Sequence, residues 1–168
     1  MINRVLRLSL LFVVLILLQV LVMNNIQFNG YINPYIYLLF ILLLPFEIPS
    51  WLLLIISFLT GLIIDLFSVS PGMHASATLV AGFIRPHILR ILSPRDGYEK
   101  GSEPSLHTYG VRWFVTYAAF IILIHHFVLF YLEVFRLSDF FRTFLRVILS
   151  SIFSLVFILL IDYYRKRK

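Results

Sequence analysis

The sequence predicts an all-α, polytopic membrane protein with six transmembrane helices, folded as a single domain over residues 1–168. Three observations lead to this prediction. First, 61% of the 168 residues are hydrophobic and only 13% are charged, whereas a soluble domain is about half apolar and a quarter charged. Second, six apolar runs approach the roughly 20 residues that a helix needs to cross a bilayer. Third, the basic residues gather on one side of the predicted membrane.

The composition also excludes several classes of protein. The mean hydropathy is +0.96, and a water-soluble fold of this size could not bury that much apolar surface. There are no cysteines, so disulfides, thiolate metal sites and cysteine nucleophiles are excluded. The net charge is +6, but the basic residues form no stripe with interleaved polar surface. Nucleic acid is therefore not an expected partner.

The six predicted spans differ in quality. The first could be mistaken for a signal peptide, because Arg4 and Arg7 precede it, but its apolar run is long and no small-x-small cleavage site follows. We therefore expect it to be retained. The second is short and contains Pro34 near its start and Pro45 near its end. The predicted spans are residues 5–23, 31–46, 51–67, 73–92, 113–135 and 141–164.

The links between spans contain turn-forming residues. Asn29-Gly30 is a turn dipeptide, and two prolines lie in the link at 45–50. Residues 68–72 read Ser-Val-Ser-Pro-Gly, which is long enough only for a tight turn between two helices. The one sizeable hydrophilic loop covers residues 93–110.

The distribution of basic residues predicts the topology. Two precede the first span, five surround the 93–110 loop and four form the C-terminal tail, eleven in all. The opposite side has only three. Since basic loops stay in the cytoplasm, we expect both termini to be cytoplasmic (N-in/C-in). The first group is Arg4, Arg7, Arg85, Arg90, Arg95, Lys100, Arg112, Arg165, Lys166, Arg167 and Lys168, and the second is Arg136, Arg142 and Arg146.

The third span ends in a polar face. Ser57, Gly61 and Asp65 follow one another at i, i+4 spacing, so they share one side of the helix. A carboxylate in a span is costly, which leaves two interpretations for Asp65. It is either solvated at the interface or capping the turn, or it contacts His74, which opens the fourth span. One Asp and one His lack the nucleophile and oxyanion site of a catalytic set, so we interpret this contact as structural.

The fourth span is rich in small residues and predicts a buried helix. With Ser57 and Gly61 of the third span, its small residues form a surface that permits close backbone approach, and we expect a partner helix to dock there. Pro71 and Gly72 should bend the link before it. Arg85-Pro86 should kink or end the helix, and we expect Arg85 to extend toward lipid phosphates. The small residues are Ala75, Ala77, Ala81 and Gly82, and Thr78 lies on the same face as His74 and Gly82.

The fifth span contains two adjacent histidines. His125 and Glu133 lie on one face, and His126 is next to His125. No metalloprotease spacing and no third ligand accompany them, so no metal site is predicted. Phosphate-binding loops, nucleophile elbows and paired carboxylates are also missing from the sequence, which predicts neither a cofactor nor an enzyme.

The run Gly-Leu-Ile-Ile-Asp-Leu-Phe-Ser-Val-Ser-Pro-Gly-Met-His-Ala at residues 61–75 resembles the helix–turn–helix signature of the rod shape-determining protein MreD family. That signature is a G-x-x-x-D helix end, a Ser/Pro/Gly turn and a small-residue helix opening near a His. The resemblance covers the chain in outline and is specific over residues 61–85. The interrupted second span and the polar 93–110 loop depart from it.

The resemblance implies a multi-pass protein of the bacterial inner membrane. Its implied role is a non-enzymatic part of the elongation machinery that directs side-wall peptidoglycan synthesis and maintains cell shape. The implied partners are membrane lipids, an MreC-like bitopic protein, an MreB-like filament, and the wall-synthesising glycosyltransferase and transpeptidase. The family is also similar in fold to the substrate-binding components of energy-coupling-factor vitamin transporters.

Three hypotheses for function follow. A membrane scaffold agrees with the near absence of extramembrane residues and of catalytic motifs. A vitamin-type transporter subunit would need a polar outward-facing cavity and a small-residue face on the first helix, which offers only Ser9. A membrane enzyme would need clustered ionisable groups, whereas Asp65, His125, His126 and Glu133 are spread over two spans.

Overall fold

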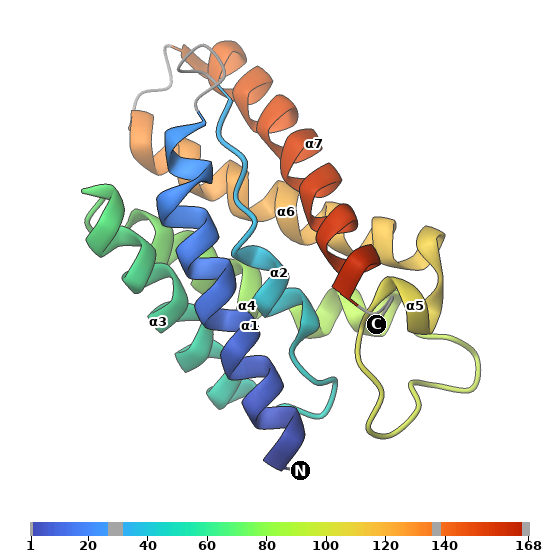
Figure 1. The fold of residues 1–168 in the computed structure, drawn as a ribbon. Helices are drawn as coiled ribbons and strands as arrows, with labels where there is room; N and C mark the ends of the chain where they lie inside the picture. Colours follow the sequence, from blue (N-terminus) through green and yellow to red (C-terminus); the bar gives the residue numbers. More distant parts are fainter. Residues whose placement is uncertain (1, 27–31, 136–138, 166–168) are drawn as a thin grey trace.

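The computed structural model describes residues 2–26, 32–135 and 139–165 (Figure 1). The predicted Asn29-Gly30 turn, Arg136 and the last three basic residues of the tail lie outside the described residues. The described chain is helical throughout its regular parts. Its elements are α1 (Ile2–Leu21), η1 (Met23–Asn25), α2 (Leu38–Leu43), α3 (Ser50–Ser68), α4 (Met73–Ile91), α5 (Leu106–Tyr109), α6 (Val111–Val134) and α7 (Phe140–Arg165).

Four helices of the described chain are long and apolar enough to cross a membrane, which makes this a multi-pass membrane protein. They are α1 continued by η1, α3, α6 and α7. The α4 helix is as long as α3, at 19 residues, but it carries two arginines and two histidines among its apolar residues. Its polar composition is possible because α4 packs between α3 and α6.

The second predicted span is not a continuous helix. Only the six residues of α2 are helical, and residues 33–35 have no regular secondary structure. Proline at 34 has no N–H for a helix and disfavours helical backbone in the residue before it. Pro45 limits the other end in the same way. Every residue of α2 is buried, so this short helix forms part of the core.

The irregular segment before α2 is held by side chains of α1 and α7. The Gln19 side-chain oxygen accepts from the Ile36 N–H at 2.8 Å, and the Ser154 hydroxyl accepts from the Tyr35 N–H at 2.8 Å. Non-helical backbone at membrane depth is stable only where protein groups replace its lost hydrogen bonds. These polar side chains therefore determine where the chain can be unwound.

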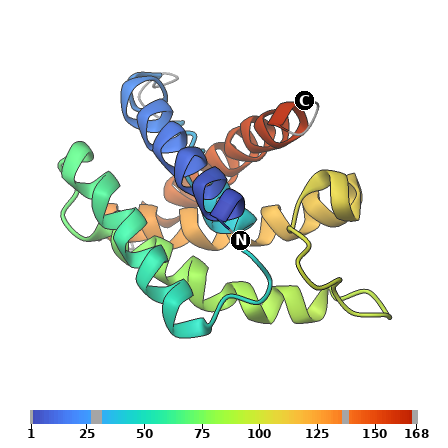
Figure 2. The ribbon, with the colours of Figure 1, turned by 60° about the horizontal axis from the view of Figure 1, so that its bottom comes forward.

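The helices are arranged in two groups around α6. Figure 2 shows α3 and α4 as an antiparallel pair on one side and α1 and α7 on the other, with α6 between them. The α6 helix packs against both α4 and α7, and α1 packs against α2 and α3. Much of the outer surface of α1 and α7 is apolar and exposed, as expected where a helix faces lipid.

Both ends of the described chain meet the 93–110 segment at one end of the bundle. Arg7 lies 4.0 Å from Glu103, and Arg165 lies 3.3 Å from the same carboxylate. The Leu106 N–H donates to Asp162 of α7 at 2.8 Å. Arg7, Arg165 and the 93–110 segment, which belong to the three groups predicted to share one side, therefore lie at the same end of the bundle.

An aromatic cluster closes this end. The Tyr98 ring stacks on Phe46 at 4.1 Å, and its hydroxyl donates to the Leu89 carbonyl at 2.6 Å. Burial raises the pKa of Tyr98 to about 12, so the hydroxyl stays protonated and remains a donor at physiological pH. Trp113 donates to the Leu92 carbonyl at 2.9 Å, which fastens the start of α6 to the end of α4.

Candidate functional site

Asp65 forms the cap of α4. Its Oδ1 accepts from the His74 N–H and its Oδ2 from the Ala75 N–H, both at 2.9 Å. The Ser70 hydroxyl donates to Oδ1 at 3.0 Å. Asp65 and His74 therefore meet as predicted, but through the main chain of His74 and not its imidazole. The structure combines the two interpretations of Asp65, since this buried carboxylate caps the hairpin through its contact with the main chain of His74.

The physical reason for this cap lies in the preceding turn. The first N–H groups of a helix have no partner within the helix and carry a partial positive charge. The residue before α4 is Gly72, with φ of 79°, and it makes no side-chain cap. Because Pro71 and Gly72 fold α4 back against α3, the carboxylate at the end of α3 reaches these N–H groups instead.

The surface of small residues is used within the chain. A Cβ at Gly61 would lie 2.6 Å from the Ala75 Cα and against the His74 carbonyl. A Cβ at Gly82 would lie 2.8 Å from the Ser57 Cβ. Gly61 and Gly82 therefore pack within the α3–α4 hairpin, and the small residues expected to receive a partner helix are buried inside the chain. The docking of a partner stays a prediction. The buried set is Ser57, Gly61, Ala77, Ala81 and Gly82.

The His74 side chain belongs to a buried polar cluster around Tyr37. The Tyr37 hydroxyl lies 3.1 Å from His74 Nδ1, 2.7 Å from His125 Nε2 and 3.3 Å from Thr78 Oγ1. A phenol has one proton to donate, so at least one of the two imidazoles must donate to it. The cluster joins α4 and α6 to the residue that precedes α2.

The second histidine of α6 takes part in a separate network. His126 Nδ1 lies 2.8 Å from the Ile122 carbonyl, and its Nε2 lies 3.0 Å from the Ser154 hydroxyl. Ser154 therefore links His126 to the main chain of Tyr35. His125 Nδ1 is buried without a hydrogen-bond partner in the described chain. Within that part of the protein, no three His, Asp or Glu side chains are grouped to hold a metal ion.

Arg85 is buried instead of extending to lipid phosphates. It is 1% exposed, and its Nε donates to the Tyr117 hydroxyl at 2.8 Å. Its Nη2 donates to the carbonyl of Leu44 and, at 3.5 Å, to that of Leu42. The prediction is wrong because Arg85 lies on the inward face of α4, where the free carbonyls at the end of α2 need donors. The α4 helix also continues through Pro86 to Ile91.

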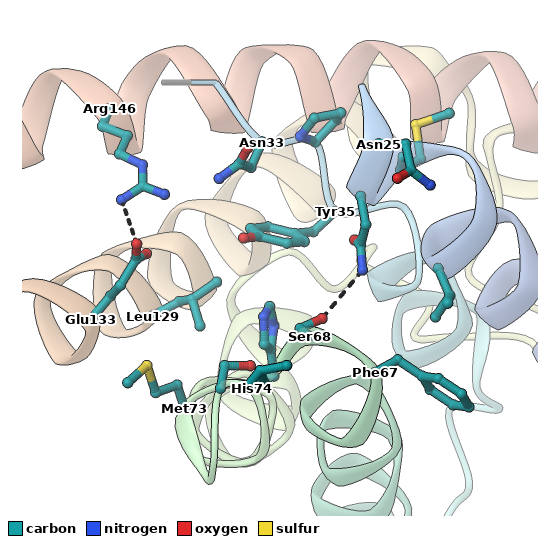
Figure 3. A pocket seen from close by; sticks show the side chains of 16 residues that line it. Asn25, Asn33, Tyr35, Phe67, Ser68, Met73, His74, Leu129, Glu133 and Arg146 are labelled. Carbon is teal, nitrogen blue, oxygen red and sulfur yellow. Dashed lines mark hydrogen bonds and ion pairs between the residues drawn. The ribbon is translucent and has the colours of Figure 1, made fainter. Parts of the chain in front are cut away.

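A polar cavity lies at the end of the bundle opposite the chain termini. Its volume is about 510 Å³, and Figure 3 shows its walls. The Tyr35 ring crosses it, and the His74 ring stands edge-on to Tyr35 at 5.0 Å. Glu133 and Arg146 form an ion pair of 3.0 Å at one side. The other polar lining residues are Asn24, Asn25, Asn33, Ser68 and Ser70.

Several of these residues were not singled out from the sequence. Tyr35 and Tyr37 read as ordinary members of an apolar span, and only contacts with distant helices give them a role. A signal did exist for Gln19, the one polar side chain between Leu10 and Met23. It also existed for Ser154 and for Ser150, whose hydroxyl accepts from the Asn33 N–H, because the two serines share one face of the last span. In the sequence, Glu133 lies on the predicted face of His125 and Arg146 is one of the basic residues, and the packing of α6 against α7 brings the two into an ion pair.

Comparisons of the chain with protein-family models, with curated proteins and with solved structures gave no match.

Proposed function

We propose that this chain is a non-enzymatic scaffold of the bacterial elongation complex, helping to direct side-wall peptidoglycan synthesis and to regulate cell shape. The observation that carries the proposal is the role of Asp65. All three of its recorded hydrogen bonds are accepted from groups of the same hairpin, and it is 5% exposed. A general base must reach a substrate proton, whereas this buried carboxylate accepts the hydrogen bonds that hold two helices together.

The proposed location is the bacterial inner membrane, crossed six times with both termini in the cytoplasm. The six crossings are α1, the segment 32–44 with α2, α3, α4, α6 and α7. The contacts of Glu103 and Asp162 at the end of the bundle that carries the termini support this topology. An arrangement like that of the substrate-binding components of energy-coupling-factor transporters is part of the proposal.

The partners we propose are an MreC-like bitopic protein, an MreB-like filament and the wall-synthesising glycosyltransferase and transpeptidase. Since the small residues of α3 and α4 are buried, a partner's membrane helix would contact the exposed apolar faces of α1 or α7. The 93–110 segment lies on the proposed cytoplasmic side, where a filament could contact it.

Depletion of the protein tests this proposal. In a rod-shaped bacterium that carries the gene, depletion should give wide or rounded cells, and the wild-type gene should restore the rods. The tagged chain, purified in mild detergent, should co-elute with a bitopic periplasmic protein. Depleted cells that keep their width would contradict the scaffold role.

A second candidate is a small-molecule-binding subunit of a transporter, and the polar cavity favours it. This hypothesis requires a polar cavity on the outward face, and the 510 Å³ cavity has a volume common for ligand sites. The same depletion experiment separates the two candidates. A transporter subunit would leave cell shape intact while uptake of one small nutrient falls.

A further inference from the structure

We propose that the cavity between α1, α3, α4, α6 and α7 binds a small zwitterion. The anionic group of the ligand would lie at Arg146 and its ammonium group at Glu133. This inference goes beyond the proposed function, because the cavity could bind such a ligand whether the chain is a scaffold or a transport subunit.

The guanidinium of Arg146 is held in a fixed position in the cavity wall. Its central carbon lies 4.1 Å from the centre of the Phe130 ring, and its Nη1 lies 3.0 Å from Glu133 Oε1. In the orientation that its neighbours favour, the Asn33 amide oxygen accepts from Nη2 at 2.9 Å. A guanidinium held on three sides is a preorganised site for a carboxylate or phosphate.

Glu133 is the more accessible member of the pair. Its side chain is 43% exposed, against 15% for Arg146. Since Arg146 is held by Phe130 and Asn33, Glu133 is the member of the pair that can turn to admit a ligand. The carboxylate can then accept hydrogen bonds from an ammonium group.

The charge balance of the lining selects against ions with a single charge. Arg146 and Glu133 are the only Arg, Lys, Asp or Glu residues recorded among the lining residues of the described chain. An anion at Arg146 would also approach the Glu133 carboxylate, and a cation at Glu133 would approach the guanidinium. A ligand carrying both charges on neighbouring atoms matches each group with its opposite.

The rest of the cavity suits the remainder of such a molecule. The edge-to-face pair of Tyr35 and His74 offers ring surfaces, and Val20, Met23 and Leu129 add apolar surface. Two kinds of molecule share this chemistry, a free α-amino acid and the headgroup of an ethanolamine phospholipid. The binding experiment needs an arm for each.

The first arm measures soluble ligands on the full chain in nanodiscs of anionic lipid, by calorimetry with a panel of free α-amino acids. For the acid that binds best, the matched N-acetyl derivative supplies an anion and the decarboxylated amine a cation. We expect the zwitterion to bind at least tenfold more tightly than either. The second arm incorporates an ethanolamine phospholipid and measures its retention by native mass spectrometry.

Two charge-neutralising variants test the assigned residues. Glu133→Gln and Arg146→Gln should each weaken zwitterion binding at least tenfold. Glu133→Gln should also strengthen binding of the matched anion, and Arg146→Gln that of the matched cation. A gain of binding cannot come from a misfolded protein. Arg142→Gln is the matched control, because Arg142 is exposed one helical turn away and does not line the cavity.

The outcomes are distinct. Binding only in the lipid arm supports the site and identifies its source as a phospholipid headgroup. Absence of binding in both arms overturns the proposal, and so does zwitterion binding that Glu133→Gln leaves unchanged. Neither failure would alter the depletion result on cell shape, so failure of this inference is distinguishable from failure of the proposed function.

Discussion

Two buried charges, on Asp65 and Arg85, are each stabilised by a helix end instead of by an opposite charge. Asp65 accepts from the first N–H groups of α4, and Arg85 donates to carbonyls at the end of α2. An uncompensated buried charge costs several kcal/mol. Hydrogen bonds to a charged group contribute about 1.5–3 kcal/mol each, so these contacts offset much of that cost and fix the ends of both helices.

The cap predicts a ranking of variants at Asp65. Asparagine has one oxygen acceptor, and its NH₂ group would face an N–H of α4, so Asp65→Asn should destabilise the protein by about 1–3 kcal/mol. Asp65→Leu removes both acceptors and should cost more. Ser70→Ala removes only the third bond and should cost least. Thermal unfolding of the detergent-purified protein measures all three.

The critical observation is the order of the thermal unfolding midpoints of the two Asp65 variants and Ser70→Ala. If Asp65→Asn unfolds at the wild-type temperature, the stability of the hairpin does not depend on both Asp65 oxygens, and capping α4 is not the main role of this residue. Because Ser70 lies in the same turn, its variant controls for general disturbance of the hairpin.

At the scale of the element, the α3–α4 hairpin depends on two glycines with different neighbours. Gly61 faces the main chain of His74 and Ala75, whereas Gly82 faces the side chain of Ser57. A substitution can shorten the Ser57 side chain, but no substitution removes the main-chain atoms that face Gly61. The two positions should therefore respond differently to a compensating substitution.

A pair of double variants tests this difference. Gly61→Ala and Gly82→Ala should each destabilise the protein by about 1–3 kcal/mol through overpacking. Adding Ser57→Gly should restore most of the stability of Gly82→Ala, since the Ser57 hydroxyl has no recorded partner within the described residues. The same addition should not rescue Gly61→Ala. Thermal midpoints of the wild type, the three single variants and the two double variants form the two required cycles.

Equal rescue of both alanine variants would contradict this account. It would mean that α3 and α4 can shift as rigid bodies, so that space made at Ser57 also relieves Gly61. Membrane abundance, measured by blot, separates a stability effect from failed insertion.

At the scale of the whole molecule, the bundle has two chemically different ends. One end joins α1, α7 and the 93–110 segment through Glu103 and Asp162. The other contains the α3–α4 turn and the polar cavity. The uneven distribution of basic residues predicts that the first end is cytoplasmic.

Single cysteines test this orientation without background, because the chain has none. Val69→Cys lies in the α3–α4 turn at a position that is 92% exposed, and Asp96→Cys lies in the exposed 93–110 segment. A membrane-impermeant maleimide should label position 69 in intact spheroplasts. Position 96 should react only after the cells are lysed. Labelling of position 96 in intact cells would reverse the orientation.

The sequence by itself determined the class of the protein and the existence of the hairpin. Hydrophobicity is a property of each segment and needs no knowledge of its neighbours, so the apolar runs predicted α1, α3, α6 and α7. The Ser-Pro-Gly turn at 68–72 predicted that α3 and α4 are antiparallel, because its chemistry is local too. The proximity of Asp65 to the start of α4 followed from that turn.

Only the tertiary structure decided which partner each polar group would find. Whether Arg85 pointed outward to lipid or inward to α2 depended on how α4 rotates against α3 and α6. The unwinding of residues 33–35 required acceptors from Gln19 and Ser154, which are distant in sequence. The pairing of Glu133 with Arg146 depends on how α6 packs against α7. Hydrogen bonds and ion pairs depend on distance and direction between separate elements, and a one-dimensional pattern contains neither.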